Sequence, residues 1–343
     1  MAVRLKDVAN ALGLSISTVS AVLRDRADFN EATRQRVLAK VKELNYRPNW
    51  LARSLATQKS HVIGVVVPNL SRSFYPSVLE GIDPEVQNAG YHLVISDTED
   101  VPAREDEEIA TLLDRQVDGM IIASAHPPGK NNVQKIMAGS GVPYLLIDRF
   151  FPDAPFVGSD DQRVGFMATQ HLIQQGYRSI AHLGRRIVAT GVGRHHGYVQ
   201  AMRKAGLRIR RKFVLEAFGE AGGHDATLQL LQMRPRPDAI FAASDPVAIG
   251  ALRALHESGV HVPQDFGVIG VGRVRYGEDL RVSLSTIDTH STEIGKTAAS
   301  ILLSIINGSP PPKGPVFIEP TLIARESSRL VLRKTKPASR RAD

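Results

Sequence analysis

The first 44 residues carry apolar positions at helical spacing, in three short blocks separated by polar residues. In the first block, Val8 and Leu12 are four residues apart, so they lie on one face of a helix. The second and third blocks carry matching stripes, formed by Val19, Val22 and Leu23 and then by Val37, Leu38, Val41 and Leu44. Three helices that bury these stripes against one another form a compact head of about 45 residues.

The junction between the first two blocks is typical of a helix-turn-helix. Gly13 separates the blocks, and Ser15 can cap the second helix. The residues of that helix outside the apolar stripe are small and mostly uncharged: Ile16, Ser17, Ser20 and Ala21. A face of this kind can enter the major groove of DNA. Asn30 can cap the third helix in the same way as Ser15 caps the second.

A short segment connects the predicted head to the rest of the chain. Pro48 ends the third helix, because proline lacks a backbone donor and disfavours helix in the residue before it. Asn49 can cap a further helix over residues 50–56, and residues 57–60 are typical of a linker. About two turns do not hold themselves helical in water, so we expect this segment to order only when something packs against it.

From His61 onward, short apolar runs alternate with helical stretches, which predicts parallel sheets covered on both faces. The first series has strands over 62–67, 91–95, 119–123 and 142–147 and helices over 75–89 and 102–115. The alternation restarts after residues 156–161, with helices over 162–175, 194–205, 223–232 and 246–257 and strands over 180–183, 212–217, 239–243 and 267–271. Two successive series predict two Rossmann-like lobes with a cleft between them.

Charge is distributed unevenly along the 343 residues, whose formal net charge is +8. Residues 1–60 contain 11 Lys and Arg against 5 Asp and Glu, and the last 11 residues contain 5 against 1. The body between them is nearly neutral. A basic head on a neutral body favours phosphate binding, although a basic terminus is also common in solvated tails.

Composition excludes several other classes of protein. The chain has no cysteine, no run of 18 apolar residues and no apolar signal segment, so we expect a cytoplasmic protein without disulfides or a membrane span. It also lacks HExxH, P-loop and Gly-x-Ser-x-Gly motifs. The sequence therefore predicts no enzyme activity, no metal site and no cofactor.

Four short motifs in the first 55 residues resemble the lactose-repressor (LacI/GalR) family of bacterial transcription regulators. They are Leu5–Ala9, Ser17–Ser20, Tyr46–Asn49 and Ala52–Leu55, and the likeness extends over residues 3–329. The alternative is an ordinary helical hairpin with a core leucine at position 55. The resemblance implies a dimer on a palindromic operator, with Ile16, Ser17 and Ala21 at base edges and Thr18, Ser20 and Asn30 on phosphates. It also implies hinge helices in the minor groove, with Ala52 and Leu55 there and Leu55 wedged between base pairs.

Ala21 departs from the family pattern, because many members carry an arginine or another polar residue at this position. Alanine can contact a thymine methyl group, but its side chain makes no hydrogen bond to a base. Ile16 is apolar as well. We therefore expect this head to recognise DNA more by methyl contacts and shape than by bidentate hydrogen bonds.

The predicted body resembles periplasmic sugar-binding proteins, as the bodies of the repressor family do. Ligands gather at the carboxyl ends of parallel strands, in the cleft. The resemblance implies that the effector contacts come from Phe74, Tyr75, Asp148, Arg149, Thr190, Arg194, Phe218 and Asp245. Alternatively, Phe74 and Phe218 are core residues, and Asp245 caps the helix that continues with Pro246.

Gly272 and Arg273 depart from the family as well, because an aspartate that grips ligand hydroxyls usually stands where this chain has Gly272. An added guanidinium at Arg273, near Arg149 and Arg194, favours an anionic effector such as a sugar acid or sugar phosphate. Alternatively, Arg273 pairs with Glu278 or Asp279 at the rim of the cleft.

These observations define one leading hypothesis: an effector-responsive, dimeric, DNA-binding repressor of carbohydrate-related genes. The alternatives are a solute receptor without a role on DNA and an α/β enzyme that acts on sugars or nucleotides. The expected domains are a head (1–48), a hinge and linker (49–60), two effector lobes (61–161 with about 291–320, and 162–290 with about 321–332) and a disordered basic tail (333–343). The expected partners are operator DNA, a sugar-like effector and a second copy of the chain.

Overall fold

The computed structural model describes residues 3–23, 30–46, 59–130, 132–152 and 154–329. It divides the chain into two compact units, residues 1–60 and 61–343. The predictions for residues 47–58, including Ala52 and Leu55, and for the tail from residue 330 concern residues outside the described ranges.

The first unit contains the three predicted helices, α1 (Leu5–Leu12), α2 (Ile16–Leu23) and α3 (Glu31–Glu43). Val8, Val19 and Val37 are fully buried at their common centre, which confirms the shared apolar stripe. Gly13 ends α1 with φ +64°, and the following Leu14 amide donates to the carbonyl of Ala9. Glycine adopts this left-handed conformation without strain, so the chain turns sharply into α2.

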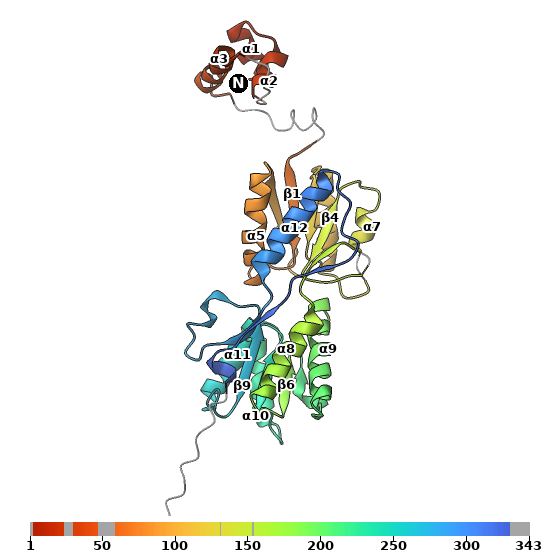
Figure 1. Ribbon diagram of the computed structural model, residues 1–343, viewed down its shortest axis with the longest axis vertical. Helices are drawn as coiled ribbons and strands as arrows, with labels where there is room; N and C mark the ends of the chain where they lie inside the picture. The colour runs from red at the N-terminus through yellow and green to blue at the C-terminus, as the bar shows by residue number, and fades with distance from the viewer. Residues whose placement is uncertain (1–2, 24–29, 47–58, 131, 153, 330–343) are drawn as a thin grey trace, which may run out of the picture. The chain divides into compact units, whose positions relative to one another are not determined.

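The second unit consists of two lobes, each built on a six-stranded sheet (Figure 1). The first sheet has the order β11-β5-β4-β3-β1-β2, with every pair parallel. The second has the order β12-β10-β9-β8-β6-β7, with β12 antiparallel and the rest parallel. The two sheets therefore repeat one topology, and the predicted pair of Rossmann-like lobes is confirmed.

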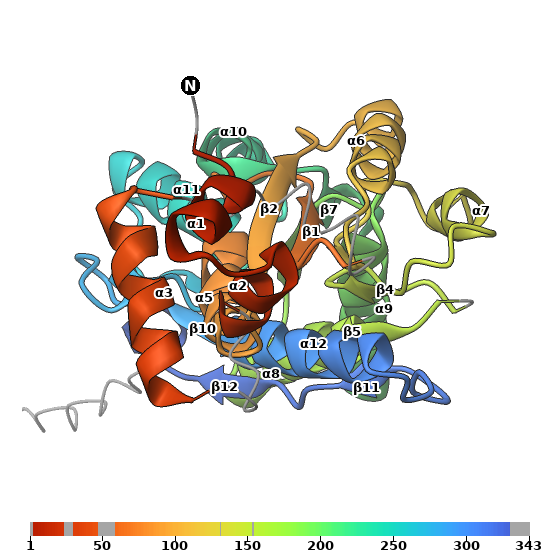
Figure 2. The same ribbon diagram turned by 90° about the horizontal axis from the view of Figure 1, so that it is seen from above.

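The first lobe has helices on both faces of its sheet. Its strands are β1 (Val62–Val67), β2 (His92–Asp97), β3 (Gly119–Ile122), β4 (Tyr144–Ile147), β5 (Phe156–Gly158) and β11 (Val316–Phe317). Its helices are α5 (Phe74–Asn88), α6 (Pro102–Asp114), α7 (Val133–Met137) and α12 (Ser291–Ile306). Figure 2 shows α6 on one side of this sheet and α12 on the other.

The second lobe is built in the same way. Its strands are β6 (Ile180–Leu183), β7 (Val214–Leu215), β8 (Ala239–Ala242), β9 (Gly267–Val271), β10 (Ser285–Asp288) and β12 (Thr321–Ile323). Its helices are α8 (Asp161–Gln174), α9 (Ala189–Lys204), α10 (Gly219–Gln232) and α11 (Asp245–Glu257), with short 3-10 turns at 211–213, 275–277 and 326–328.

The chain passes between the lobes three times: from β5 to α8, from β10 to α12 and from β11 to β12. The hydroxyl of Ser159, in the first connection, donates to the backbone carbonyl of Thr289 in the second at 3.1 Å. The first two connections therefore lie against each other, between the two sheets.

Three pairs of neighbouring helices approach closely through glycine, namely α5 with α12, α8 with α9 and α10 with α11. In the first pair, a Cβ at Gly81 would lie 2.0 Å from the carbonyl oxygen of Thr292, and one at Gly295 would lie 2.0 Å from that of Val78. No side chain fits at such a distance, so glycine sets the spacing of these helices.

Several elements differ from the predicted bounds. β5 continues the first sheet, whereas the pattern marked residues 156–161 only as the point of restart. α9 and α10 begin at Ala189 and Gly219, several residues before the predicted starts, because tertiary packing overrides the low helix propensity of their glycine-rich first turns. β7 has only two residues. α7, α12, β10, β11 and β12 were not predicted as elements.

Candidate functional site

The outer face of α2 is the candidate DNA-contacting surface. Ile16 is 52% exposed, Ser17 is also exposed, and Thr18, Ser20 and Ala21 are half-buried. The hydroxyl oxygen of Ser15 accepts a hydrogen bond from the Thr18 amide at 3.0 Å, as predicted for a helix cap. The cap fixes the start of α2, and its first turn therefore carries the exposed, largely uncharged face.

Asn30 lies at the start of α3. Its side-chain oxygen accepts hydrogen bonds from the amides of Ala32 at 2.6 Å and Thr33 at 3.3 Å, which confirms the predicted cap. The side chain remains exposed, and a helix N-terminus favours a nearby anion. Asn30 can therefore hold α3 in place beside a phosphate group.

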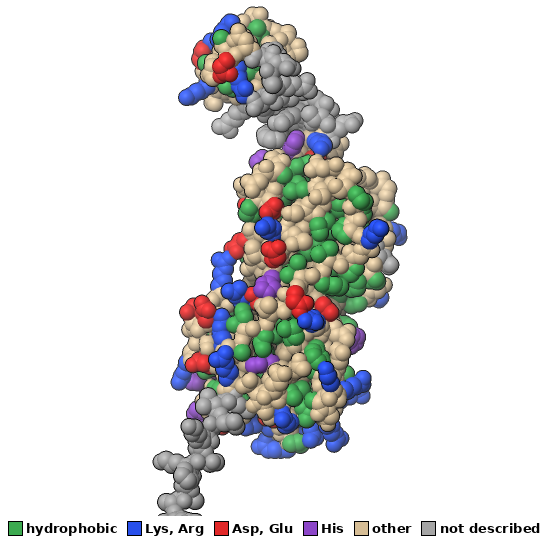
Figure 3. All heavy atoms as spheres, in the orientation of Figure 1, with side chains coloured by type: hydrophobic (Ala, Val, Ile, Leu, Met, Phe, Trp, Pro, Cys, Tyr) green, Lys and Arg blue, Asp and Glu red, His purple; other side chains and the backbone are tan. Residues whose placement is uncertain are grey.

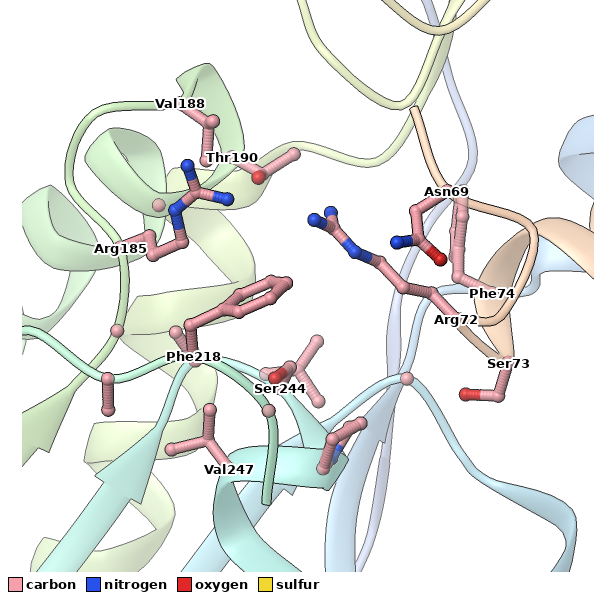
Figure 4. Close-up of a pocket in the computed structure, with 18 of the residues that line it drawn as sticks. Asn69, Arg72, Ser73, Phe74, Arg185, Val188, Thr190, Phe218, Ser244 and Val247 are labelled. Carbon is pink, nitrogen blue, oxygen red and sulfur yellow. The ribbon is translucent and has the colours of Figure 1, made fainter. Parts of the chain in front are cut away.

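A cavity of about 420 Å³ lies between the two lobes, at the carboxyl ends of their strands. This volume falls in the range of small-molecule sites. Six of the nine predicted effector residues line it: Phe74, Tyr75, Asp148, Thr190, Arg194 and Phe218. Among the other lining residues are Asn69, Arg72, Ser73, Arg185, Val188 and Ser244 (Figure 4). Tyr276 lines the cavity as well.

On the first lobe, a buried hydrogen bond sets the floor of the cavity. The Tyr75 hydroxyl donates to Asp148 Oδ2 at 2.8 Å, and burial together with the Asp148 charge raises the Tyr75 pKa well above its usual value. The Phe74 ring packs edge-on against the Tyr75 ring, with 5.2 Å between their centroids. The two aromatic residues therefore present a fixed apolar wall beside one carboxylate.

On the second lobe, Arg194 lies at the cavity wall on α9. Its Nε donates to Asp161 Oδ1 at 2.8 Å, and its Nη1 donates to the backbone carbonyl of Ala243 at 2.6 Å. Burial raises the pKa of Asp161 to about 7; Arg194 opposes this shift and the Asp148 charge adds to it. Arg194 thus keeps donors at the cavity while it is anchored from behind.

Arg149 was expected in the pocket, but the structure does not bring it there. Its side chain is 1% exposed and bonds to Asp100 Oδ1 at 2.8 Å and to the Ser124 carbonyl at 2.7 Å. Burial lowers its pKa, but the neighbouring Tyr75, Asp148 and Asp100 outweigh that effect and raise it. Arg149 supports the wall from inside the first lobe.

Asp245 was also expected at the cavity, and the structure places it behind the wall. Its carboxylate is fully buried and accepts hydrogen bonds from the Val274 amide at 2.8 Å and the Thr286 hydroxyl at 2.7 Å. Burial raises the pKa of Asp245 to about 6, against the effect of these two bonds. Asp245 is not the cap of α11 either, because Ser244 holds the capping position and Asp245 is the first residue of the helix.

Arg273 lies away from the effector cavity, on a second, polar cavity between the lobes. Its guanidinium is 59% exposed and pairs with Asp288 at 2.9 Å, not with Glu278 or Asp279. Glu278 pairs with Arg325 instead. Acidic and basic side chains gather on the visible surface where the lobes meet (Figure 3). The anionic-effector hypothesis therefore receives no support from Arg273.

Two arginines that the sequence did not reveal line the polar side of the cavity, Arg72 and Arg185, and the carboxylate of Asp100 holds them both. Arg72 and Arg185 both pair with Asp100 Oδ2, at 2.9 Å and 2.6 Å. Each of the three follows a strand, β1, β2 and β6 respectively, so the rule that places ligands at carboxyl ends could have found them.

Two further features bear on the chemistry of the site. No group of three or more His, Asp or Glu side chains in the described ranges is arranged to hold a metal ion. The described helices include none that is long and apolar enough to cross a membrane.

Comparisons with known proteins match this architecture. Residues 4–49 match the family model described as bacterial regulatory proteins, lacI family, and residues 169–328 match a periplasmic binding protein-like domain. A ribose operon repressor of Escherichia coli K12 is 33% identical over 330 residues, which are 94% of this chain and 99% of that protein. A transcriptional repressor PurR of Erwinia tasmaniensis is 28% identical over 328 residues, which are 94% of this chain and 96% of the relative.

Solved structures give the same result. The Lac repressor dimer bound to operator and the anti-inducer ONPF has a TM-score of 0.88 and 26% identity, over 96% of this chain and 100% of that one. A complex of the transcriptional regulator CelR with cellobiose has a TM-score of 0.72 and 29% identity, over 95% of this chain and 99% of that one.

A helix-turn-helix head followed by a two-lobed, periplasmic-binding-protein-like body is the domain organisation of a DNA-binding transcription regulator. The chain belongs to the LacI family of bacterial regulatory proteins. The predicted family and fold class are thereby confirmed, and a regulator of this family is not an enzyme.

Proposed function

We propose that this regulator is a dimeric repressor of carbohydrate-related genes that binds a palindromic operator and is controlled by a small polar effector. The observation that carries this proposal is the union, in one chain, of an exposed uncharged helix face and an interlobe cavity of ligand size. A receptor without a DNA role would have no use for the capped α1–α2 unit.

The head supports the DNA part of the proposal. Ile16, Ser17 and Ala21 contact base edges, while Thr18, Ser20 and Asn30 hold phosphates; Ala52 and Leu55 enter the minor groove. The similar Lac repressor structure is a dimer bound to operator, and a two-fold dimer requires a site with matching symmetry. We infer the same arrangement for this chain.

The body supports the effector part. The proposed contacts are the six predicted residues at the cavity: Phe74, Tyr75, Asp148, Thr190, Arg194 and Phe218. Aromatic faces beside carboxylate, hydroxyl and guanidinium groups suit a sugar, a sugar acid or a sugar phosphate. The relative named ribose operon repressor and the CelR–cellobiose complex agree with a carbohydrate-like ligand.

We also propose the domain limits given above, in which residues 291–320 belong to the first effector lobe and residues 321–332 to the second. The packing of α12 against α5 and the pairing of β11 with β5 support the first assignment. The pairing of β12 with β10 supports the second.

Selection of duplexes from a randomised DNA library by the full chain tests the operator proposal. We expect an inverted repeat with A·T pairs opposite Ile16 and Ala21, because these side chains can contact thymine methyl groups. A selected sequence without two-fold symmetry, or no enrichment at all, would contradict the proposal.

The matched variants are Ile16→Asp and Leu38→Asp, which change two exposed apolar side chains of the head. Only the first lies on the proposed recognition face, so only it should abolish binding to the selected duplex. Sedimentation of both variants checks that they remain dimers. Equal loss of binding in both would show that charge anywhere on the head is enough.

A further inference from the structure

Asp100 binds three arginines at the edge of the effector cavity. Its Oδ1 accepts from Arg149 at 2.8 Å, and its Oδ2 accepts from Arg72 at 2.9 Å and Arg185 at 2.6 Å. Arg72 and Asp100 belong to the first lobe, and Arg185 belongs to the second. One carboxylate therefore holds guanidinium groups from both sides of the cavity.

The positive charge at this point exceeds the negative charge. Arg149 has a second carboxylate near it, since its Nε lies 3.9 Å from Asp148. In the described part of the chain, Arg72 and Arg185 pair with no carboxylate except Asp100. Burial favours the protonated form of Asp100, but Arg149 and Arg72 lower its pKa to about 2, so it is already ionised at neutral pH. Two guanidinium groups at this edge of the cavity therefore share one carboxylate, which Arg149 also binds.

The two guanidinium groups retain unused donors. Arg72 Nε is buried and has no hydrogen-bond partner among the described residues. Each group bonds to Asp100 through a single nitrogen, although a guanidinium carries five N–H donors. Both arginines line the cavity, so a ligand acceptor there can use their remaining terminal donors.

An exposed aromatic ring lies beside the same two groups. The guanidinium carbons of Arg72 and Arg185 are 4.7 Å and 4.9 Å from the centre of the Phe218 ring, which is 51% exposed. In Figure 4, the two guanidinium groups point toward one another with Phe218 next to them. Donors for an acid group and an apolar face thus adjoin each other in one cavity.

We propose that the effector is an acid, whose carboxylate or phosphate binds between Arg72 and Arg185 while its ring or carbon chain lies against Phe218. Guanidinium groups suit this task because their planar donors match two oxygens of such a group at once. The inference rests on the proposed function, since it names the class of effector for the same cavity.

The arrangement also couples the ligand to the lobes. Arg72 and Arg185 come from opposite lobes, so an anion that both hold adds a link across the cleft to the one that Asp100 makes. The effector therefore favours the arrangement in which these two arginines are close, and it disfavours one in which the lobes move apart.

Calorimetric titration of the full chain with matched probes tests the proposal. The probes are D-ribose and D-ribose 5-phosphate, D-glucose and D-gluconate, and inorganic phosphate. We expect at least one acidic sugar to bind roughly tenfold or more tightly than its neutral partner, a difference that one charge-assisted contact can supply. Inorganic phosphate should compete with that acidic sugar.

Arg185→Gln should remove the preference for the acidic probe, so that the acidic sugar and its neutral partner bind this variant with affinities within about twofold of each other. Arg186→Gln is the matched control, because this neighbouring arginine pairs with Glu216 and does not line the cavity. Arg72→Gln should repeat the effect of Arg185→Gln from the other lobe.

Three results would overturn the inference: neutral probes that bind as tightly as acidic ones, an acid preference that survives in Arg185→Gln, and no binding of any acidic probe at millimolar concentration. Each leaves the proposed function intact if the same protein binds its selected operator. Failure of the unmodified chain to bind the selected operator would count against the proposed function instead.

Discussion

Each lobe has, at the cleft, an arginine that bonds to a backbone carbonyl and to a carboxylate, but the two arginines differ in their surroundings. In the first lobe, Arg149 donates to the carbonyl of Ser124, just after β3; in the second, Arg194 donates to the carbonyl of Ala243, just after β8. β3 and β8 hold equivalent places in sheets of identical order. Each arginine also pairs with a carboxylate, Arg149 with Asp100 and Arg194 with Asp161.

The difference lies in what each arginine faces. Arg149 is enclosed within the first lobe, whereas Arg194 stands at the cavity wall with its side chain 13% exposed. The carboxylate partners differ as well: arginines hold the pKa of Asp100 at about 2, while burial brings that of Asp161 to about 7. The same pair of groups is therefore a rigid support in one lobe and, as we propose, a ligand contact in the other.

Matched methionine substitutions should separate the two roles and give the largest effect. Arg149→Met keeps most of the buried volume but removes a buried charge, so the Ser124 carbonyl loses its donor and Asp100 loses one of its three arginines. We expect the free energy of unfolding to fall by about 3–5 kcal/mol, as when one member of a buried ion pair is removed. Urea unfolding followed by circular dichroism measures this change.

Arg194→Met is the control for that experiment. Its partner Asp161 can take up a proton near neutral pH, so the loss of the cation leaves no strongly ionised group behind. We expect a fall of about 1 kcal/mol, with weaker effector binding and unchanged operator affinity. Equal destabilisation by the two substitutions would mean that Arg194 is a support like Arg149.

A second comparison concerns the carboxylate of Asp245, which the second lobe buries completely. Burial raises the Asp245 pKa to about 6, whereas an aspartate in an unfolded chain titrates near pH 4. The folded state therefore binds this proton more tightly. The stabilising effect of this bound proton is complete below about pH 4 and is lost as the pH rises from about 4 to about 6.

Asp245→Asn isolates this effect, since asparagine does not titrate. The unfolding free energy of the unmodified chain, relative to Asp245→Asn, should fall by about 2–3 kcal/mol between pH 4 and pH 7. Most of the fall should occur below pH 6. A difference that is constant across this range would show that Asp245 titrates at its ordinary pKa.

The sequence predicted most of the fold because its signals were local. Apolar runs between turn residues located β1, β6 and β9, and the helical stripes with their Ser15 and Asn30 caps located the head. What it missed depends on tertiary packing. β11 and β12 have two and three residues, too few for a pattern, and each exists only because the chain returns to the edge of a sheet.

The site was predicted less completely, for a related reason. The strand-end rule and the family resemblance selected residues that follow the carboxyl ends of strands. Of these, Phe74, Arg194 and Phe218 do line the cavity. Position along the chain does not say whether an arginine faces the cleft or the lobe interior. That choice depends on distant carboxylates such as Asp100, which is 49 residues from Arg149 and 85 from Arg185.

Arg273→Ala should have the smallest effect and separates the two cavities. Arg273 is 59% exposed and pairs with Asp288, which also accepts a hydrogen bond from the His290 amide. Asp288 is buried, but the Arg273 guanidinium is exposed to solvent, so we expect the pair to contribute about 1 kcal/mol and this contribution to weaken as salt rises. We therefore expect unfolding, operator binding and effector affinity to change little. A tenfold loss of affinity for an acidic effector in this variant would return the anion site to Arg273 and remove it from the Arg72–Arg185 pair.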